Sequence, residues 1–272
     1  MNTVKKIENL EEYIKVAKTF KLRFGLSKAS INPWFRGHSE REYCLQPTLY
    51  REANRVIKEC EKEILRDFKL KSRPFINEYN AKSDIEYMML MQHYGLPTRL
   101  LDWSESYLVA LFFAVCNYKN TKDASVWVLN PWELNSDRSS VNSRSILQPN
   151  DKDLINWLLD EDGKIKGEFP VAIRAAMNSN RIVGQKGIFT LFGEIDGSLD
   201  NLIYGCEEII IQGDKKLDLL KELYEAGISY STIFPEITGI CQEIAFRYSS
   251  YLGEDNFRWN NPSNYSKSRG QF

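Results

Sequence analysis

The stretch from residue 92 to residue 104 constrains the fold of this chain more than any other. Its sequence, QHYGLPTRLLDWS, alternates side chains that can hydrogen-bond a ligand with large apolar ones. A surface loop does not need the leucines and the tryptophan, and a plain core does not need Arg99 and Asp102 between them. We therefore expect this segment to form one wall of a site. A buried Arg99–Asp102 ion pair, holding a loop between two helices, explains the same pattern without a ligand, because buried charges are usually paired.

A second polar segment, WFRGH, occupies residues 34–38. Arg36 beside Gly37 at the end of a strand is suited to binding an anion, because the guanidinium is a planar donor fork and glycine lets a ligand approach the backbone. Pairing of Arg36 with a core carboxylate is the alternative interpretation. The only two histidines of the chain, His38 and His93, lie in these two polar segments.

A third candidate segment covers residues 181–190, where Gly184 and Gly187 flank Gln185 just before an apolar stretch. By spacing alone, a β-bulge or hairpin is the better interpretation of these glycines. The sequence contains no P-loop, dinucleotide-binding glycine fingerprint, zinc signature or nucleophile elbow. We therefore expect no metal in the site.

The composition excludes several classes of protein. The 272 residues are 43% hydrophobic, which suffices for a core in one large domain or two coupled ones. The net charge of −1 gives no general attraction to nucleic acid or anionic membranes. The five cysteines are not closely spaced, which fits a reducing compartment. The early acidic residues do not suit a signal peptide, and the longest apolar run, near residues 109–116, is too short to span a bilayer. A cytoplasmic protein is expected.

Hydrophobic periodicity predicts helices first and most strands later. Helices are expected over residues 8–24, 49–70, 84–94, 104–117, 150–161, 215–226 and 235–251, and strands over 34–37, 124–129, 182–192 and 207–211. Asp84 and Ser104 are the expected N-caps of their helices, and Gly95 and Gly227 the expected closing residues. This order predicts an α+β fold with a helix-rich N-terminal half and a small mixed or antiparallel sheet.

Four segments together resemble the FRG domain, which takes its name from the Phe-Arg-Gly tripeptide. The sequences FRGH (35–38) and LQPTLYR (45–51) resemble its opening, and QHYGLPTRLLDW (92–103) with ALFFA (110–114) resembles its central block. QKGIFT (185–190) and FPEITGI (234–240) resemble its later blocks. The resemblance implies a division into an N-terminal helix (1–30), an FRG domain (31–252) and a polar, flexible tail (253–272).

The order of these segments is also similar, more weakly, to arginine–serine–glutamate ADP-ribosyltransferases, which implies a fold of that type. In this resemblance Arg36 grips the phosphates of NAD, Ser104 belongs to the segment that shapes the nicotinamide pocket, and Gln185 begins the catalytic glutamate motif. Gly187 stands where that motif has its glutamate. Gln185 can hydrogen-bond a hydroxyl, but it lacks the negative charge that stabilises an oxocarbenium-like transition state.

The glycine at position 187, in place of the glutamate of the motif, leaves three possibilities. Another carboxylate supplies the charge, with Asp102, Glu194 and Glu236 as candidates; or activity is lost; or the correspondence between the motifs fails.

The resemblance implies an enzyme that uses NAD as co-substrate to modify a protein or nucleic acid, as a bacterial toxin or phage-defence effector with an antitoxin partner and no membrane partner. The catalytic residues would be Arg36, His93, Asp102 and Gln185. The residues that bind the cofactor would be Arg36, Gly37, His38, Gln92, Thr98, Arg99 and Ser104.

Two other functions remain alternatives. One is a non-catalytic module that senses a nucleotide or a protein partner, which the glycine at position 187 favours. The other is a nucleic-acid-processing protein that does not use NAD. The net charge of −1 argues against the latter, because broad backbone binding relies on Lys and Arg.

Overall fold

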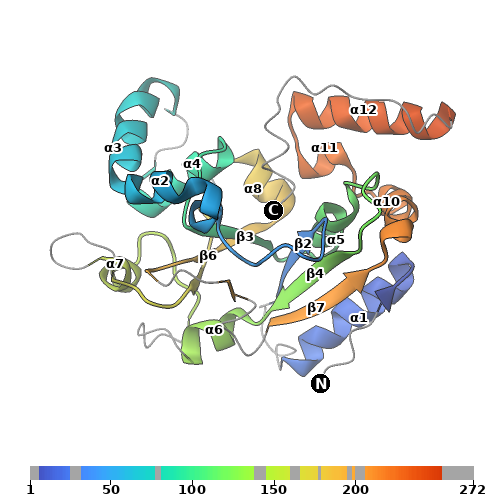
Figure 1. Cartoon of the computed structure of the whole chain (residues 1–272), viewed down its shortest axis with the longest axis horizontal. Coiled ribbons are helices and arrows are strands. Elements are labelled where there is room, and N and C mark those ends of the chain that lie inside the picture. The colour runs from blue at the N-terminus through green and yellow to red at the C-terminus, as the bar shows by residue number, and fades with distance from the viewer. Residues whose placement is uncertain are drawn as a thin grey trace.

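The computed structural model describes residues 6–24, 32–76, 81–137, 145–159, 166–176, 179–194, 198–199 and 206–252. The expected polar tail, 253–272, lies outside these residues. Helices surround a seven-stranded mixed sheet, which confirms the α+β class (Figure 1). In the part of the chain described, no helix is long and apolar enough to cross a membrane.

The strands lie in the order β1-β7-β4-β2-β3-β6-β5, and only β1 pairs in parallel, with β7. Their bounds are β1 Lys6–Ile7, β2 Trp34–His38, β3 Leu100–Ser104, β4 Ala124–Leu129, β5 Val171–Ile173, β6 Gly187–Leu191 and β7 Cys206–Ile211. The helices before β4 are α1 Leu10–Arg23, η2 Thr48–Tyr50, η3 Glu52–Asn54, α2 Arg55–Glu59, α3 Glu61–Ser72, η4 Arg73–Phe75, α4 Asp84–His93 and α5 Tyr107–Val115. The later helices are α6 Pro131–Asp137, α7 Lys152–Leu158, α8 Asn180–Gln185, η5 Gly213–Lys215, α10 Lys216–Glu225, α11 Tyr230–Ile233 and α12 Ile237–Leu252.

The sheet consists of two parts that meet at a single residue pair. Strand β2 pairs with β4 over five residues, and β3 pairs with β6 over five residues. Between β2 and β3, however, only Phe35 and Ser104 are paired. Beyond that pair no ladder holds the two strands together, so side chains can enter between them.

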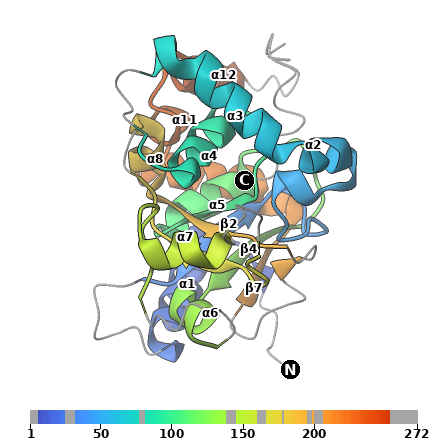
Figure 2. The same ribbon diagram turned by 90° about the vertical axis from the view of Figure 1, so that its left-hand side faces the viewer.

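Each part of the sheet has its own hydrophobic core. Helices α1, α5 and α10 pack against β2, β4 and β7, and helices α3, α4 and α7 pack against β3, β5 and β6. Figure 2 shows α3 and α4 in front of α11 and α12, which lie to the right of them in Figure 1. A third core, around Trp34, Tyr50 and Trp103, covers the other face of the sheet where its two parts join.

Several predicted elements are confirmed, and the closing residues follow the expected rule. The first helix, the strands at residues 124–129 and 207–211, and the helices near 150–161 and 215–226 are all present. Gly95 and Gly227 follow α4 and α10 with φ angles of 92° and 83°, the left-handed conformation that glycine adopts without strain.

Other predictions were wrong in detail. The expected helix over 49–70 is broken into η2, η3, α2 and α3. The cap of α4 is Ser83 rather than Asp84, and the cap of α5 is Ser106 rather than Ser104. The expected strand over 182–192 begins as helix α8 and becomes β6 only at Gly187. The expected helix over 235–251 begins at Ile237, preceded by the short helix α11.

Candidate functional site

Arg36 lies in the opening between β2 and β3 and links the two parts of the sheet. Its side chain is only 2% exposed, and one terminal nitrogen donates a 2.5 Å hydrogen bond to the main-chain oxygen of Asp102 on β3. The same nitrogen lies 3.9 Å from the Asp102 carboxylate. Arg36 thus lies near a carboxylate, as the alternative interpretation expects, although the ion pair is long. Its guanidinium also provides a hydrogen bond between β2 and β3 at a point where these strands form no main-chain hydrogen bonds with each other.

His38 accepts a hydrogen bond from Arg36. The distance from Arg36 Nε to His38 Nε2 is 3.1 Å, and His38 is fully buried. Burial lowers the pKa of His38, and the neighbouring charge of Arg36 lowers it further. A nitrogen that accepts from a guanidinium carries no proton, so His38 is a neutral acceptor that orients Arg36.

The Asp102 carboxylate is the acidic group at the centre of the site. Its side chain is 30% exposed, and one oxygen accepts a 2.6 Å hydrogen bond from Gln92 at the end of α4. Gln92 in turn accepts a hydrogen bond from the Thr98 hydroxyl, which fixes the orientation of the amide. Burial raises the pKa of Asp102, while Arg36, Arg181 and the Gln92 hydrogen bond lower it. A partly exposed carboxyl with a raised pKa is suited to accepting a proton.

Arg51, which directly follows η2, is a cation whose side chain has no partner among the described residues. Within the described part of the chain, its half-buried side chain forms no hydrogen bond or ion pair. Burial lowers the pKa of Arg51, and the charge of Asp102 opposes that shift. Arg51 also lines a pocket of about 810 Å³ between η2, α2 and α3. Arg51 ends the FRG-like segment 45–51 but is not among the residues predicted for the site.

The pocket carries equal numbers of positive and negative side chains. Its charged lining consists of Arg51, Arg55, Lys58, Lys62 and Arg99 with Glu52, Glu59, Glu61, Glu63 and Glu194. Arg99 is bound to Glu61, and Arg55 lies 3.9 Å from Glu59. Such a lining suits a polar ligand that bears groups of both signs.

Arg99 has a structural position and does not pair with Asp102. Its side chain is 3% exposed and binds the Glu61 carboxylate through two nitrogens. A third nitrogen donates to the Tyr50 hydroxyl at 2.9 Å and to the main-chain oxygens of Phe192 and Gly193 at 2.9 and 3.1 Å. The ion pair weighed from the sequence, Arg99 with Asp102, is therefore replaced by Arg99 with Glu61, which ties α3 to the sheet.

Gly37 faces helix α5 rather than a ligand. A Cβ atom at this position would lie 1.9 Å from the main-chain oxygen of Ala110 and 2.7 Å from the main-chain nitrogen of Ala114. The glycine is thus required for close packing of β2 on α5. The expectation that Gly37 opens the backbone to a ligand does not agree with this packing.

The remaining predicted residues lie around this centre with different contacts. Ser104 pairs with Phe35 and Gly187, and its hydroxyl donates a 2.7 Å hydrogen bond to the main-chain oxygen of Gln185. The Gln185 amide donates to the main-chain oxygen of Ile233 at 3.2 Å. His93 ends α4, and its ring packs edge-on against Tyr94 with the ring centres 4.8 Å apart. The contacts described in the preceding paragraphs join other predicted residues in one hydrogen-bonded network: Arg36, His38, Gln92, Thr98 and Asp102.

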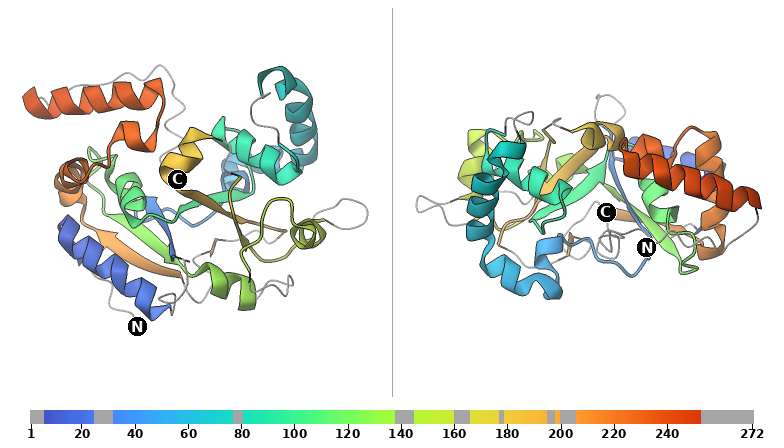
Figure 3. Two further views of the ribbon diagram at one scale, coloured as in Figure 1. Left: turned by 180° about the vertical axis from the view of Figure 1, so that it is seen from behind. Right: turned by 90° about the horizontal axis from the view of Figure 1, so that it is seen from above.

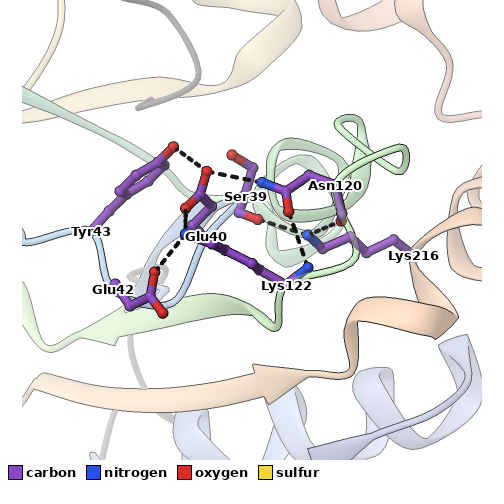
Figure 4. Close-up of polar contacts among 7 residues, drawn as sticks. All are labelled: Ser39, Glu40, Glu42, Tyr43, Asn120, Lys122 and Lys216. Carbon is purple, nitrogen blue, oxygen red and sulfur yellow. Dashed lines mark hydrogen bonds and ion pairs between the residues drawn. The ribbon is translucent and has the colours of Figure 1, made fainter.

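A buried lysine fixes the turn that follows β2 (Figure 4). Lys216 at the start of α10 is fully buried, and its amine donates 2.8 Å hydrogen bonds to the main-chain oxygens of Ser39 and Asn120. Glu40 in the same turn accepts hydrogen bonds from Tyr43, Asn120 and Lys122. These contacts hold the end of β2, and therefore Arg36 and His38, against α5 and α10.

Comparison with known proteins gives one match. Residues 32–123 match the family model of the FRG domain, and no curated protein or solved structure matches the chain significantly. The match covers about a third of the chain and contains Arg36, His38, Arg51, Gln92 and Asp102. Segments 185–190 and 234–240 lie outside it. The match therefore identifies an FRG domain at residues 32–123, the part of the chain that holds the hydrogen-bonded network.

Proposed function

We propose that this FRG domain binds NAD in the pocket beside Arg51 and transfers the ADP-ribosyl group to an acceptor, with Asp102 as the catalytic carboxylate. The observation that carries the proposal is the position of Arg51. Its uncommitted guanidinium lines a pocket of about 810 Å³ and has the partly exposed Asp102 as a charged neighbour. Asp102 is not among the residues that line the pocket, so in the proposal the pyrophosphate lies in the pocket beside Arg51 and the nicotinamide ribose extends beyond the lining towards Asp102.

The pocket suits NAD in size and in charge. Small-molecule and cofactor sites occupy roughly 300–1,000 Å³, and this pocket lies within that range. NAD carries a negative pyrophosphate, a positive nicotinamide ring and ribose hydroxyls that donate hydrogen bonds. In the proposal Arg51 binds the pyrophosphate as a planar donor fork, and carboxylates of the lining accept from the ribose hydroxyls.

The reaction requires a negative charge near the C1′ atom of the nicotinamide ribose. The bond between C1′ and the ring nitrogen breaks, and nicotinamide leaves with the bonding electron pair. A lone pair of the acceptor forms the new bond to C1′, and the acceptor proton passes to Asp102. The carboxylate stabilises the positive charge that develops on the ribose, and its raised pKa suits it to take up the proton.

The arrangement of the three motifs supports this proposal. The segments that resemble the arginine, serine and glutamate motifs lie on or beside neighbouring strands: Arg36 on β2, Ser104 at the end of β3, and Gln185 directly before β6. Asp102 lies two residues before Ser104 on β3, beside Arg36. It thereby offers a carboxylate close to the position where the third motif has Gln185 and Gly187 instead of glutamate. In this account Arg36 positions Asp102, and Arg51 takes the role of binding phosphate.

Nicotinamide release by the purified chain tests the proposal. The measurement follows release from NAD, labelled in the nicotinamide ring, with cell extract as a source of acceptors. We expect Asp102→Asn to reduce the rate at least about 100-fold, since single electrostatic groups contribute on this scale. Arg55→Gln is the control, because Arg55 is an exposed cation of the same pocket and should change the rate little. Full activity of Asp102→Asn would contradict the assignment.

A non-catalytic nucleotide-binding module is the second candidate. It is favoured by the glycine at position 187, where the resemblance expects the catalytic glutamate, and by the Gln185 amide, which is bound to the main-chain oxygen of Ile233. Saturable NAD binding by the wild-type chain without nicotinamide release would support this function over the enzyme. Absence of NAD binding would exclude the enzyme and an NAD-binding module.

A further inference from the structure

Positive charge is concentrated on the helical arm formed by α2, α3 and η4, residues 55–75. This arm has seven Lys or Arg and four Asp or Glu, although the net charge of the whole chain is −1. Figure 1 and Figure 3 show α3 at one edge of the molecule, with α1 and α10 at the opposite edge. Cations that gather on one element of an otherwise acidic chain indicate a local binding surface for an anionic partner.

Four of these cations form one row along the arm. Residues three and four positions apart lie on the same face of a helix, and the row consists of Lys62, Arg66, Lys69 and Arg73. Lys69 is bound to Asp84. The other three are exposed, and their side chains form no hydrogen bond or ion pair with any residue that the structure describes. The row therefore offers three unpaired cations to a partner.

Most of the carboxylates of the arm are already paired within the chain. Three of the four form the ion pairs Glu59–Arg55, Glu61–Arg99 and Asp67–Lys71. The fourth, Glu63, forms no ion pair with the described residues. One free negative charge thus stands against three free positive ones, so the outer surface of the arm keeps a positive excess after internal pairing.

An open aromatic ring follows the row of cations. Phe75 ends η4, two residues after Arg73, and is 82% exposed. Nucleobases stack on exposed aromatic rings, because every base has a π face. Proteins that hold a single nucleic-acid strand combine such a ring with cations that bind the phosphates. The arm has both kinds of group in sequence.

We infer that this arm binds a single-stranded nucleic acid, with the three unpaired cations on its phosphates and Phe75 stacked on a base. A membrane surface fits less well, because the apolar face of α3, with Ile64, Leu65 and Phe68, packs in a core and is not available to lipid. An acidic protein segment could bind the cations but offers no base to the ring. The inference involves no NAD, so its test is separate from that of the proposed function.

Fluorescence anisotropy of the full chain with labelled oligonucleotides tests the inference. The probes are one RNA and one DNA strand of the same sequence, about 12 nucleotides long to cover one binding site. We expect the wild type to bind with micromolar affinity at low salt. The triple variant Lys62→Gln, Arg66→Gln, Arg73→Gln should bind at least about tenfold more weakly. The slope of log affinity against log salt should become shallower by about two, because each neutralised phosphate of a single strand contributes about 0.7.

A second triple variant is the matched control. Lys15→Gln, Lys18→Gln, Lys221→Gln removes the same charge from exposed positions on α1 and α10, at the opposite edge of the molecule. Because salt screens distant charges, this variant should lose less than about twofold in affinity. Equal losses in the two triple variants would overturn the inference, since they would show a response to net charge alone. Circular dichroism checks that both variants fold.

Phe75→Ala tests the stacked base. Its affinity should fall about fivefold or more while the salt dependence stays that of the wild type, because stacking contributes roughly 1–3 kcal/mol and releases no ions. Leu70→Ala, at an apolar residue that is 65% exposed, should leave binding unchanged. Wild-type affinity of Phe75→Ala would overturn the assignment of a nucleic acid. So would the absence of binding to both strands, or tighter binding to poly-glutamate than to either of them.

Discussion

Nε of Arg36 donates a 3.1 Å hydrogen bond to Nε2 of His38, two residues further along the same strand. Both side chains are almost completely buried, so the histidine must stay neutral to accept this bond. Arg36 in turn contacts Asp102 across the opening between β2 and β3. The protonation of one buried histidine is therefore coupled to the position of the central carboxylate.

Acid should destabilise the fold through His38. Burial lowers its pKa from the ordinary value of 6.5, so the unfolded chain binds a proton more readily than the folded one below that pH. The stability contributed by neutral His38 is complete above about pH 6.5 and is lost as the pH falls towards the lower folded pKa, by at most about 1.4 kcal/mol per pH unit. Urea unfolding at about pH 7.5 and at about pH 5 measures this loss.

His38→Gln is the matched variant, since the glutamine oxygen can accept from Arg36 but does not titrate. We expect its unfolding free energy to fall less on acidification than that of the wild type. His93→Gln, at the only other histidine, should keep the wild-type acid sensitivity. The account of His38 is wrong if the His93 variant, rather than the His38 variant, loses that sensitivity.

Replacement of Arg99 by lysine should destabilise the protein by about 2–4 kcal/mol, because one ammonium cannot reproduce contacts to Glu61, Tyr50 and two main-chain oxygens. Chemical denaturation measures the change. Arg55→Lys provides the comparison: the Arg55–Glu59 pair is exposed, and its loss should cost less than about 0.5 kcal/mol. Equal effects of the two substitutions would show that Arg99 is not a structural anchor.

Gly37→Ala should cost about 3 kcal/mol or more, because the added methyl group would meet main-chain atoms of α5 that cannot move independently. Gly187→Ala, on β6 of the same sheet, is the control. Its new Cβ would find the nearest atoms at 3.6 Å, an ordinary contact, so stability should change by less than about 1 kcal/mol. Thermal unfolding compares the two, and a well-tolerated Gly37→Ala would contradict the packing role.

Local chemistry made some elements predictable. The glycines at positions 95 and 227 follow their helices as expected, because a helix end is determined by a few neighbouring residues. The N-cap of α4 was displaced by one residue because Ser83 and Asp84 are both good capping residues. The opening and central FRG-like segments also lie together as expected, since Arg36 contacts Asp102.

Strand β3 could not be recognised from its pattern. Leu100 packs in one core while Leu101 and Trp103 pack in another, so both faces of the strand carry buried apolar residues. Leu100 lies on the same face as Asp102 and Ser104, which breaks the apolar–polar alternation at the start of the strand. Recognition of this strand would have excluded the Arg99–Asp102 pair. Residues separated by three positions in an extended chain point to opposite faces.

The importance of Arg51 lies in a tertiary relationship that has no local signal. It begins a stretch rich in lysine and arginine, and nothing in the sequence tells which of these cations has no partner. Only in the folded chain does the charge of Asp102, which lies 51 positions later in the sequence, act on the pKa of Arg51.

The proposed function requires Arg51 to bind the pyrophosphate of NAD. Calorimetric titration of the full chain with NAD measures this binding, with Arg51→Gln compared with the wild type and with Arg55→Gln. We expect saturable wild-type binding and at least about a tenfold loss of affinity in Arg51→Gln, because hydrogen bonds to charged groups contribute about 1.5–3 kcal/mol. Arg55→Gln should bind nearly as well as the wild type. Absence of wild-type binding, or equal affinities of wild type and Arg51→Gln, would contradict the claim.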